Sequence, residues 1–264
     1  MKPQIKYGTI LIFFLSFFIL PCLLKAQELT DEEKARANNP LANTKAFNIQ
    51  YYYRPNLNLI EGGQAHTAWF RIAVPTWRIL WRLSAPLETR LVNNSTTNFS
   101  ESGLGDLDLF AAYLAVMKPK FTFGFGPAAS FNTASDDALG TGKNTLGAAV
   151  IVFAVPDKQF QVGGLVIWRT DISGDENREG VNILAVQPIL LWQLGKGLYF
   201  RSVPIWAFDL QNGNYNVPMG FGIGQIFKIK NVVFNFFVEP QFSILVKGAG
   251  QPVFQIYTAL NMQF

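Results

Sequence analysis

Polar and apolar residues alternate with a period of two along most of this chain. In the last thirteen residues, Phe254, Ile256 and Leu260 share one parity, and Gln255 and Asn261 share the other. Successive side chains of a β-strand point to opposite faces, so this segment predicts a strand with one apolar and one polar face. A strand of a soluble β-sandwich and a strand of a membrane β-barrel both have this pattern. The rest of the chain has to distinguish these two folds.

The alternation recurs from residue 45 onward, and no helical period of 3.6 residues persists past residue 40. Between residues 145 and 209 both parities are apolar in places, so the facing of those strands stays open. Twelve strands are expected, over residues 45–54, 65–74, 78–91, 105–116, 121–131, 145–155, 160–172, 181–193, 198–209, 215–227, 232–246 and 252–264.

The connections between these strands alternate between short and long. Short ones that contain Pro, Gly or Lys take turns with longer polar ones over residues 92–104, 132–144, 173–180 and 210–214. Short periplasmic turns and long outer loops are typical of bacterial outer-membrane barrels. We therefore predict an all-β fold, a transmembrane antiparallel up-and-down β-barrel of about 12 strands in the cell outer membrane. An even strand number places both ends of the barrel on the periplasmic side.

The first 26 residues have the features of an export signal. Lys2 and Lys6 precede a nearly apolar run from Thr9 to Leu24, and Ala26 offers a small residue before a cut at Gln27. The run is shorter than the ~20 residues of a spanning helix. We expect residues 1–26 to be a signal peptide.

Residues 27–44 differ from the rest of the mature chain. Thr30 and Glu33 have the spacing of a capping box, and the polar run that follows ends at Asn39-Pro40. This segment predicts a short N-terminal periplasmic helix that reaches into the barrel mouth, and a disordered leader is the alternative. The barrel itself is expected over residues 45–264.

Composition narrows the function classes. Removal of Lys2, Lys6 and Lys25 with the signal leaves 19 basic and 18 acidic residues, a net charge of +1, so nothing points to nucleic acid. The single cysteine, Cys22, also lies in the signal, so the mature chain has no disulfide. The sequence has 24 Phe, 6 Trp and 8 Tyr, an aromatic surface that a barrel can turn toward lipid.

Several charged residues have the parity of the polar face. An Arg facing lipid at mid-membrane costs about 2–4 kcal/mol, so these side chains should point into the lumen. They form either a constriction that sets selectivity or a salt-bridge network that fills the barrel. The candidates are Arg71, Arg82, Glu88, Arg90, Asp106, Asp108, Arg169, Arg201 and Glu239.

Catalytic chemistry has little support. His66 is the only histidine and no nucleophile motif accompanies it, so we expect it near a strand end at the membrane interface rather than in a catalytic set. The scattered carboxylates do not have the clustering of a metal site, although residues 132–143 and Asp171, Asp175 and Glu176 leave weak calcium binding open. We predict no enzyme activity, no cofactor and no metal.

A set of short motifs, in order along residues 28–264, carries a family resemblance. They are Asn38-Asn39-Pro40-Leu41-Ala42-Asn43, Gly103-Leu104-Gly105-Asp106, Lys118-Pro119, Gly126-Pro127 with Asp136–Lys143, Gln187-Pro188 and Val217-Pro218. Together they resemble the outer-membrane family named for the MetA pathway of phenol degradation, whose members are described as transporters. The resemblance implies an outer-membrane barrel and passage of aromatic or other hydrophobic small molecules, and it implies no catalytic residues.

Two functions are therefore expected from the sequence. The first is a channel for passive passage of small solutes, aromatic or hydrophobic ones among them. The alternative is a closed structural or binding barrel whose outer loops meet partners. The expected partners are outer-membrane lipid and lipopolysaccharide, the barrel-assembly machinery through the C-terminal Phe264, and a small-molecule solute.

Overall fold

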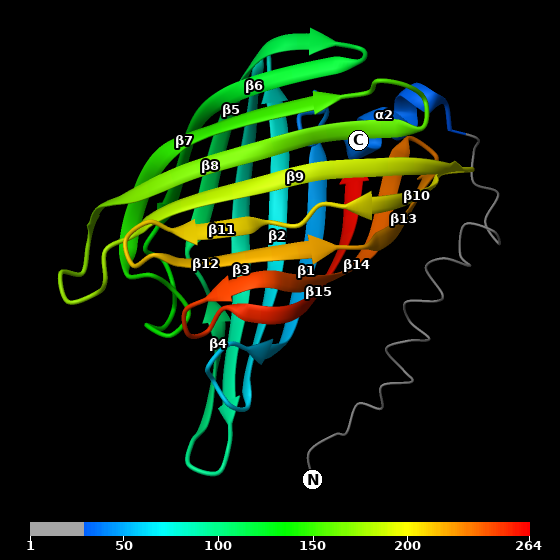
Figure 1. Ribbon diagram of the computed structural model, residues 1–264. Coiled ribbons are helices and arrows are strands. Elements are labelled where there is room, and N and C mark those ends of the chain that lie inside the picture. Colours follow the sequence, from blue (N-terminus) through cyan, green and yellow to red (C-terminus); the bar gives the residue numbers. More distant parts are fainter. Residues whose placement is uncertain (1–28) are drawn as a thin grey trace.

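The computed structural model describes residues 29–264, which form a β-barrel with a short helix at its N-terminal end (Figure 1). The predicted export signal over residues 1–26 lies outside the described residues. The elements are α2 (Asp31–Asn38), β1 (Ala46–Leu57), β2 (Gly63–Thr76), β3 (Ile79–Asn93), β4 (Asn98–Leu104), β5 (Leu107–Lys118), β6 (Phe121–Phe131), β7 (Lys143–Ala154), β8 (Phe160–Gly174), β9 (Asn182–Gly195), β10 (Leu198–Ser202), β11 (Trp206–Asp209), β12 (Asn214–Gly220), β13 (Gly222–Ile229), β14 (Val232–Lys247) and β15 (Pro252–Gln263).

The sheet closes on itself. Each strand pairs antiparallel with its neighbours, and β1 pairs with β15 from Ala46↔Gln263 to Tyr53↔Ile256, which joins the first strand to the last. Closure leaves no open sheet edge, as a membrane interior requires. The predicted transmembrane barrel of about 12 strands is confirmed. Fifteen strand segments make twelve crossings because β4–β5, β10–β11 and β12–β13 are three crossings that are each interrupted once.

The outer wall is apolar on every crossing. The side chains of one parity, such as Ile72, Leu83, Val150 and Phe242, are among the exposed large hydrophobic residues, and Phe242 is 53% exposed. Such a surface would be unfavourable in water, but it matches the apolar band of a barrel in lipid. Within residues 29–264, no helix has both the length and the apolar character needed to cross a membrane.

The two ends of the barrel differ. The C-terminus and α2 lie at the same end, that of the short turns, whereas the longer connections lie at the opposite, outer end (Figure 1). The loop predicted over residues 92–104 is largely a hairpin instead. There β3 continues to Asn93 and pairs with β4 in register from Leu87↔Leu104 to Asn93↔Asn98. Both faces of this hairpin lie outside the apolar band, so it is rich in Ser, Thr and Asn. It therefore has no alternation of polar and apolar residues that would have predicted a strand.

The wall is interrupted between β10 and β11. Residues 203–205 pair with neither neighbouring strand, and Pro204 has no N–H to offer. Side chains replace the missing ladder bonds. The Val203 N–H donates to Glu239 Oε1 at 2.9 Å, and Gln187 Nε2 donates to the Val203 carbonyl oxygen at 3.3 Å. The N–H and C=O groups of Val203 thereby have partners at the break.

The Glu239 carboxylate that serves this break is fully buried. Its other oxygen accepts from Arg201 Nε at 2.5 Å, and the Arg201 guanidinium lies 3.3 Å from the centroid of the Phe237 ring. A Cβ at Gly220 or Gly222 would lie 2.0 Å and 2.7 Å, respectively, from atoms of the Glu239 side chain. These two glycines of the β12–β13 crossing therefore make the space in which the ion pair sits.

Replacement of Glu239 by Ala should destabilise the barrel strongly. The substitution leaves the Arg201 guanidinium buried without a counter-charge and the Val203 N–H without an acceptor. Loss of one partner of a buried pair costs about 3–5 kcal/mol. The measurement is the midpoint of unfolding in urea, followed by the shift in gel mobility between folded and unfolded barrel.

The matched control is Glu61→Ala, because Glu61 is exposed in the outer loop between β1 and β2. That change should stay within about 0.5 kcal/mol of the parent. Equal midpoints for the two variants would show that the ion pair does not support the interrupted wall.

Candidate functional site

A cavity of about 640 Å³ lies inside the barrel. Its walls are the inward-facing side chains of strands all around the barrel, and its floor at the turn end includes residues 37–40 of the N-terminal segment. The volume is in the range of sites that hold small molecules. The cavity is therefore the candidate site for a solute.

Seven of the nine charged residues predicted for the lumen line this cavity. Glu239 is the eighth and lies buried behind the lining, against Arg201. Asp106 is not in the lining and lies at the outer end instead. The role of these residues in selectivity stays a prediction. The seven are Arg71, Arg82, Glu88, Arg90, Asp108, Arg169 and Arg201.

Two ion pairs lie among the cavity-lining residues in addition to Arg201–Glu239. Arg90 Nη2 lies 3.4 Å from Glu88 Oε2, and Arg169 forms a close hydrogen-bonded pair with Asp108. The second pair joins β8 to β5, which are not sheet neighbours, so it lies across the lumen rather than along the wall. Part of the predicted salt-bridge network is thus present.

The sequence analysis missed several residues of the cavity. Arg54 lines it and donates from Nη1 to Thr67 Oγ1 at 2.8 Å, and Tyr52 stacks on Tyr257 with ring centroids 4.3 Å apart. The alternation of β1 gave the signal, because Arg54 has the parity of Tyr52 and Gln50. Arg54 stands at the very end of the strand expected over residues 45–54 and Tyr52 has no charge, so neither is among the charged lumen candidates.

Residues 29–44 lie inside the turn end of the barrel. Leu41 is 1% exposed and packs in an apolar cluster with inward residues such as Leu80 and Phe110. Leu29 and Ala37 belong to a second inward cluster that includes Tyr199. The predicted N-terminal helix is present with the expected capping box at Thr30 and Glu33, and the segment fills part of the lumen.

Polar bonds hold this segment in place. Lys228 Nζ donates to Glu33 Oε1 at 2.7 Å, and Asn235 Nδ2 donates to the Ala37 carbonyl oxygen at 3.2 Å. Hydrogen bonds from Lys228 and from the Thr30 N–H lower the pKa of the Glu33 carboxyl below its usual value. The docked state therefore favours ionised Glu33.

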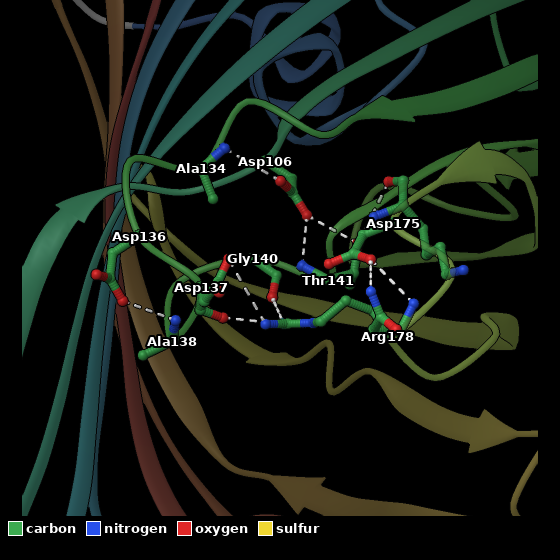
Figure 2. A network of polar contacts seen from close by, with 11 residues as sticks. Asp106, Ala134, Asp136, Asp137, Ala138, Gly140, Thr141, Asp175 and Arg178 are labelled. Carbon is green, nitrogen blue, oxygen red and sulfur yellow. Dashed lines mark hydrogen bonds and ion pairs between the residues drawn. The ribbon is translucent and has the colours of Figure 1, made fainter.

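Asp106 organises the outer end. Its carboxylate accepts hydrogen bonds from the backbone N–H groups of Ala134 and Thr141 in the loop after β6, as Figure 2 shows. Arg178 comes from the loop after β8. It donates to the carbonyl oxygens of Asp137 and Gly140, which are in the loop after β6. Asp106 and Arg178 thus both hold the loop over residues 132–142. The position of Asp106 at this loop differs from the lumen position that the sequence predicted for it.

His66 and the carboxylates considered for calcium binding do not line the cavity. His66 is on the outward parity of β2, with its Nδ1 2.6 Å from Tyr51 Oη and its ring stacked on Tyr53 at 5.0 Å. Within residues 29–264, no three His, Cys, Asp or Glu residues come close enough together to hold a metal ion. The loop carboxylates considered for calcium, Asp171 and Asp175, take part in bonds to the backbone of their own loop.

No family model matches this chain, and no curated protein matches it. Among solved structures it is similar to the COG4313 outer membrane channel from Pseudomonas putida F1, with a TM-score of 0.64, 11% identity, and coverage of 86% of this chain and 98% of that one. It also matches the KdgM porin (TM-score 0.47, 10% identity, 83% and 98% coverage) and the Pseudomonas putida toluene transporter TodX (TM-score 0.36, 12% identity, 90% and 93% coverage).

Similarity at 11% identity shows the fold alone, and TM-scores below 0.5 are too low to support an argument. The closed wall, the apolar outer band and this fold define an outer-membrane β-barrel, and the chain is assigned to the cell outer membrane. The resemblance to the family named for the MetA pathway stays a prediction, because no family model matches.

Acid should loosen the N-terminal segment. Because the pKa of Glu33 is lowered in the docked state, its stabilising contribution is present above the usual value of 4.5 and is lost as the pH falls through the lowered pKa. A partly exposed ion pair contributes up to about 1 kcal/mol, so the ion current through single barrels in a planar bilayer should rise by up to about fivefold between about pH 6 and about pH 3.

Glu33→Gln should give the raised current already at the higher pH and a flatter pH profile. Glu32→Gln is the matched control, because Glu32 is exposed on the same helix and forms no ion pair among the described residues. An unchanged pH profile in Glu33→Gln would exclude the Glu33–Lys228 bond as a fastening of the segment.

Proposed function

We propose that this chain is an outer-membrane channel for passive passage of small solutes, aromatic and other hydrophobic ones among them. The observation that carries the proposal is the closed barrel around a cavity of about 640 Å³ lined by both aromatic and charged side chains. A barrel built only for stiffness has no need of such a space, because a packed lumen would bury more surface.

The lining supports solutes with an aromatic or apolar body. Trp69, Phe110, Tyr52 and Tyr257 all face the cavity, and Leu80 continues the apolar surface toward the turn end. Stacking and burial against such side chains favour aromatic solutes over sugars. The name of the similar Pseudomonas putida protein, an outer membrane channel, agrees with this proposal.

The N-terminal segment supports a second candidate, a closed barrel. Residues 29–44 pack against inward residues, and Leu41 is nearly completely buried there. In the channel proposal this segment is displaced to let a solute leave the cavity at the periplasmic end. In the closed-barrel alternative it stays in place and the outer loops bind partners.

We propose the remaining partners, lipid, lipopolysaccharide and the barrel-assembly machinery, on the same arrangement. The apolar band contacts outer-membrane lipid, and the outer hairpin and loops face lipopolysaccharide. Phe264 is 61% exposed, and its N–H donates to the Lys45 carbonyl oxygen at 3.0 Å, next to the seam between β1 and β15. This position leaves the terminal aromatic ring available to the barrel-assembly machinery.

Removal of residues 27–44 from the mature chain should increase solute flux. In a liposome swelling assay with L-phenylalanine and arabinose, which cross lipid slowly, the shortened barrel should swell liposomes several-fold faster than the full mature chain. The physical reason is that the segment occupies the turn end of the lumen. Phenylalanine should gain more than arabinose because the cavity is lined by aromatic side chains.

The control is deletion of residues 94–97 at the tip of the outer hairpin between β3 and β4. It removes polar residues, of which Asn94 is half-buried and the other three are exposed, and it leaves the lumen lining intact. Folding is checked for every variant by gel mobility. Swelling no faster than in protein-free liposomes, for both the full and the shortened barrel, would leave the closed barrel as the function.

A further inference from the structure

The cavity carries more positive than negative charge. Six arginines line it against the two carboxylates of Glu88 and Asp108, and the buried Glu239 adds a third. Each of the three carboxylates is matched by one arginine within 4.0 Å. Three arginines are left without a carboxylate at that distance, namely Arg54, Arg71 and Arg82.

Two of these arginines lie next to each other. In the register of β2 and β3, Arg71 is opposite Ser84 and Arg82 is opposite Ala73, which makes the arginines diagonal neighbours on the lumen face. Arg82 has no hydrogen bond or ion pair to any described residue, and Arg71 donates only from Nη1, to Gln50 Oε1 at 2.6 Å. Unlike these two, Arg54 is tied to Glu88 through Thr67.

Aromatic rings hold both guanidinium groups in place. Arg82 lies 4.9 Å from the centroid of the Phe110 ring, and Arg71 lies 4.8 Å from that of Trp69. Stacking on a ring occupies the flat face of a guanidinium and leaves its N–H edge free to bond in the plane. The Arg82 edge is thus held in place without an acceptor, and the Arg71 edge has one acceptor, Gln50, for its Nη1.

An apolar surface adjoins this pair of arginines. Phe110 and Leu80 belong to the inward apolar cluster that also takes in Leu41 of the N-terminal segment, and Ala73 and Ile167 pack against it. A ligand with its charged end at Arg71 and Arg82 would rest its body on this surface. Two cations beside an apolar wall fit an organic anion better than an inorganic one.

We infer that the lumen binds a small organic anion, a carboxylate on an aromatic or other apolar body, with Arg71 and Arg82 holding the carboxylate. The inference rests on the proposed channel function and names the class of solute. Carboxylates match the planar fork of arginine and form charge-assisted hydrogen bonds with it. Arg71 and Arg82 are both half-buried. Holding two such cations without a carboxylate partner lowers the stability of the barrel, and an anionic solute offsets that cost when it binds.

The test is binding of benzoate to the full mature chain in detergent, measured by titration calorimetry at fixed ionic strength near neutral pH. Benzamide is the neutral ligand of the same shape, and acetate is the carboxylate without the ring. We expect benzoate to bind at least about tenfold more tightly than either. Arg71→Gln and Arg82→Gln should each weaken benzoate binding by about tenfold or more, as expected for a charge-assisted bond.

Arg78→Gln is the matched control. It removes the same charge, but Arg78 lies in the turn before β3, outside the cavity lining, and bonds to the Ala115 carbonyl oxygen. It should bind benzoate like the parent. Arg82→Gln should also keep or raise the midpoint of unfolding in urea, because it removes a half-buried charge that has no carboxylate partner. This measurement separates lost binding from lost folding.

Three results would overturn the inference. They are equal affinity for benzamide and benzoate, equal affinity for acetate and benzoate, and unchanged benzoate binding in Arg82→Gln. The swelling assay is independent of this one. Flux without benzoate binding would contradict the anion site and support the channel. Benzoate binding without flux would support the anion site and contradict the channel.

Discussion

The structure depends on one constraint: in a membrane interior, each backbone N–H and C=O group must find a partner within the protein. The seam between β1 and β15 meets this constraint by closing the sheet. It also explains the unusual break at residues 203–205. There the side chains of Gln187 and Glu239 take over bonds that the strands do not form. Polar side chains in this wall thus bond to the Val203 backbone groups in place of a neighbouring strand.

Closure has a consequence for the interior. With the outer face committed to lipid, most charged side chains in the middle of the crossings are directed into one shared space, where charges are costly unless they pair. The pairs Arg169–Asp108 and Arg201–Glu239 reduce that cost. Arg71 and Arg82 have no such carboxylate partner. This absence among the described residues is the reason for the anion site inferred there. In a stability-optimised barrel this pair would be the first to be replaced.

The N-terminal segment makes the lumen asymmetric. Leu41 and the apolar clusters close the turn end, while the outer end is bounded by loops fastened through Asp106 and Arg178. The cavity therefore lies between a packed floor and an ordered outer rim. The floor has no strand ladder. It is held by packing and by side-chain bonds, some of them partly exposed as in Lys228–Glu33, so it is held more weakly than the hydrogen-bonded wall. This difference in strength is what a displaceable segment requires.

The sequence by itself determined the crossings, the outward apolar parity outside residues 145–209, and the direction of most charges. Alternation is a local property, and lipid on one side makes a one-residue slip of register prohibitive. The capping box at Thr30 and Glu33 was equally local.

Only the tertiary structure decided which charges pair, where Asp106 bonds, and which lumen residues hold the N-terminal segment. Those contacts join residues far apart, such as Glu33 and Lys228, and they depend on how a closed and sheared sheet places its strands. The pattern of one strand does not contain the identity of the residue that faces it across the barrel, so the sequence could not supply it.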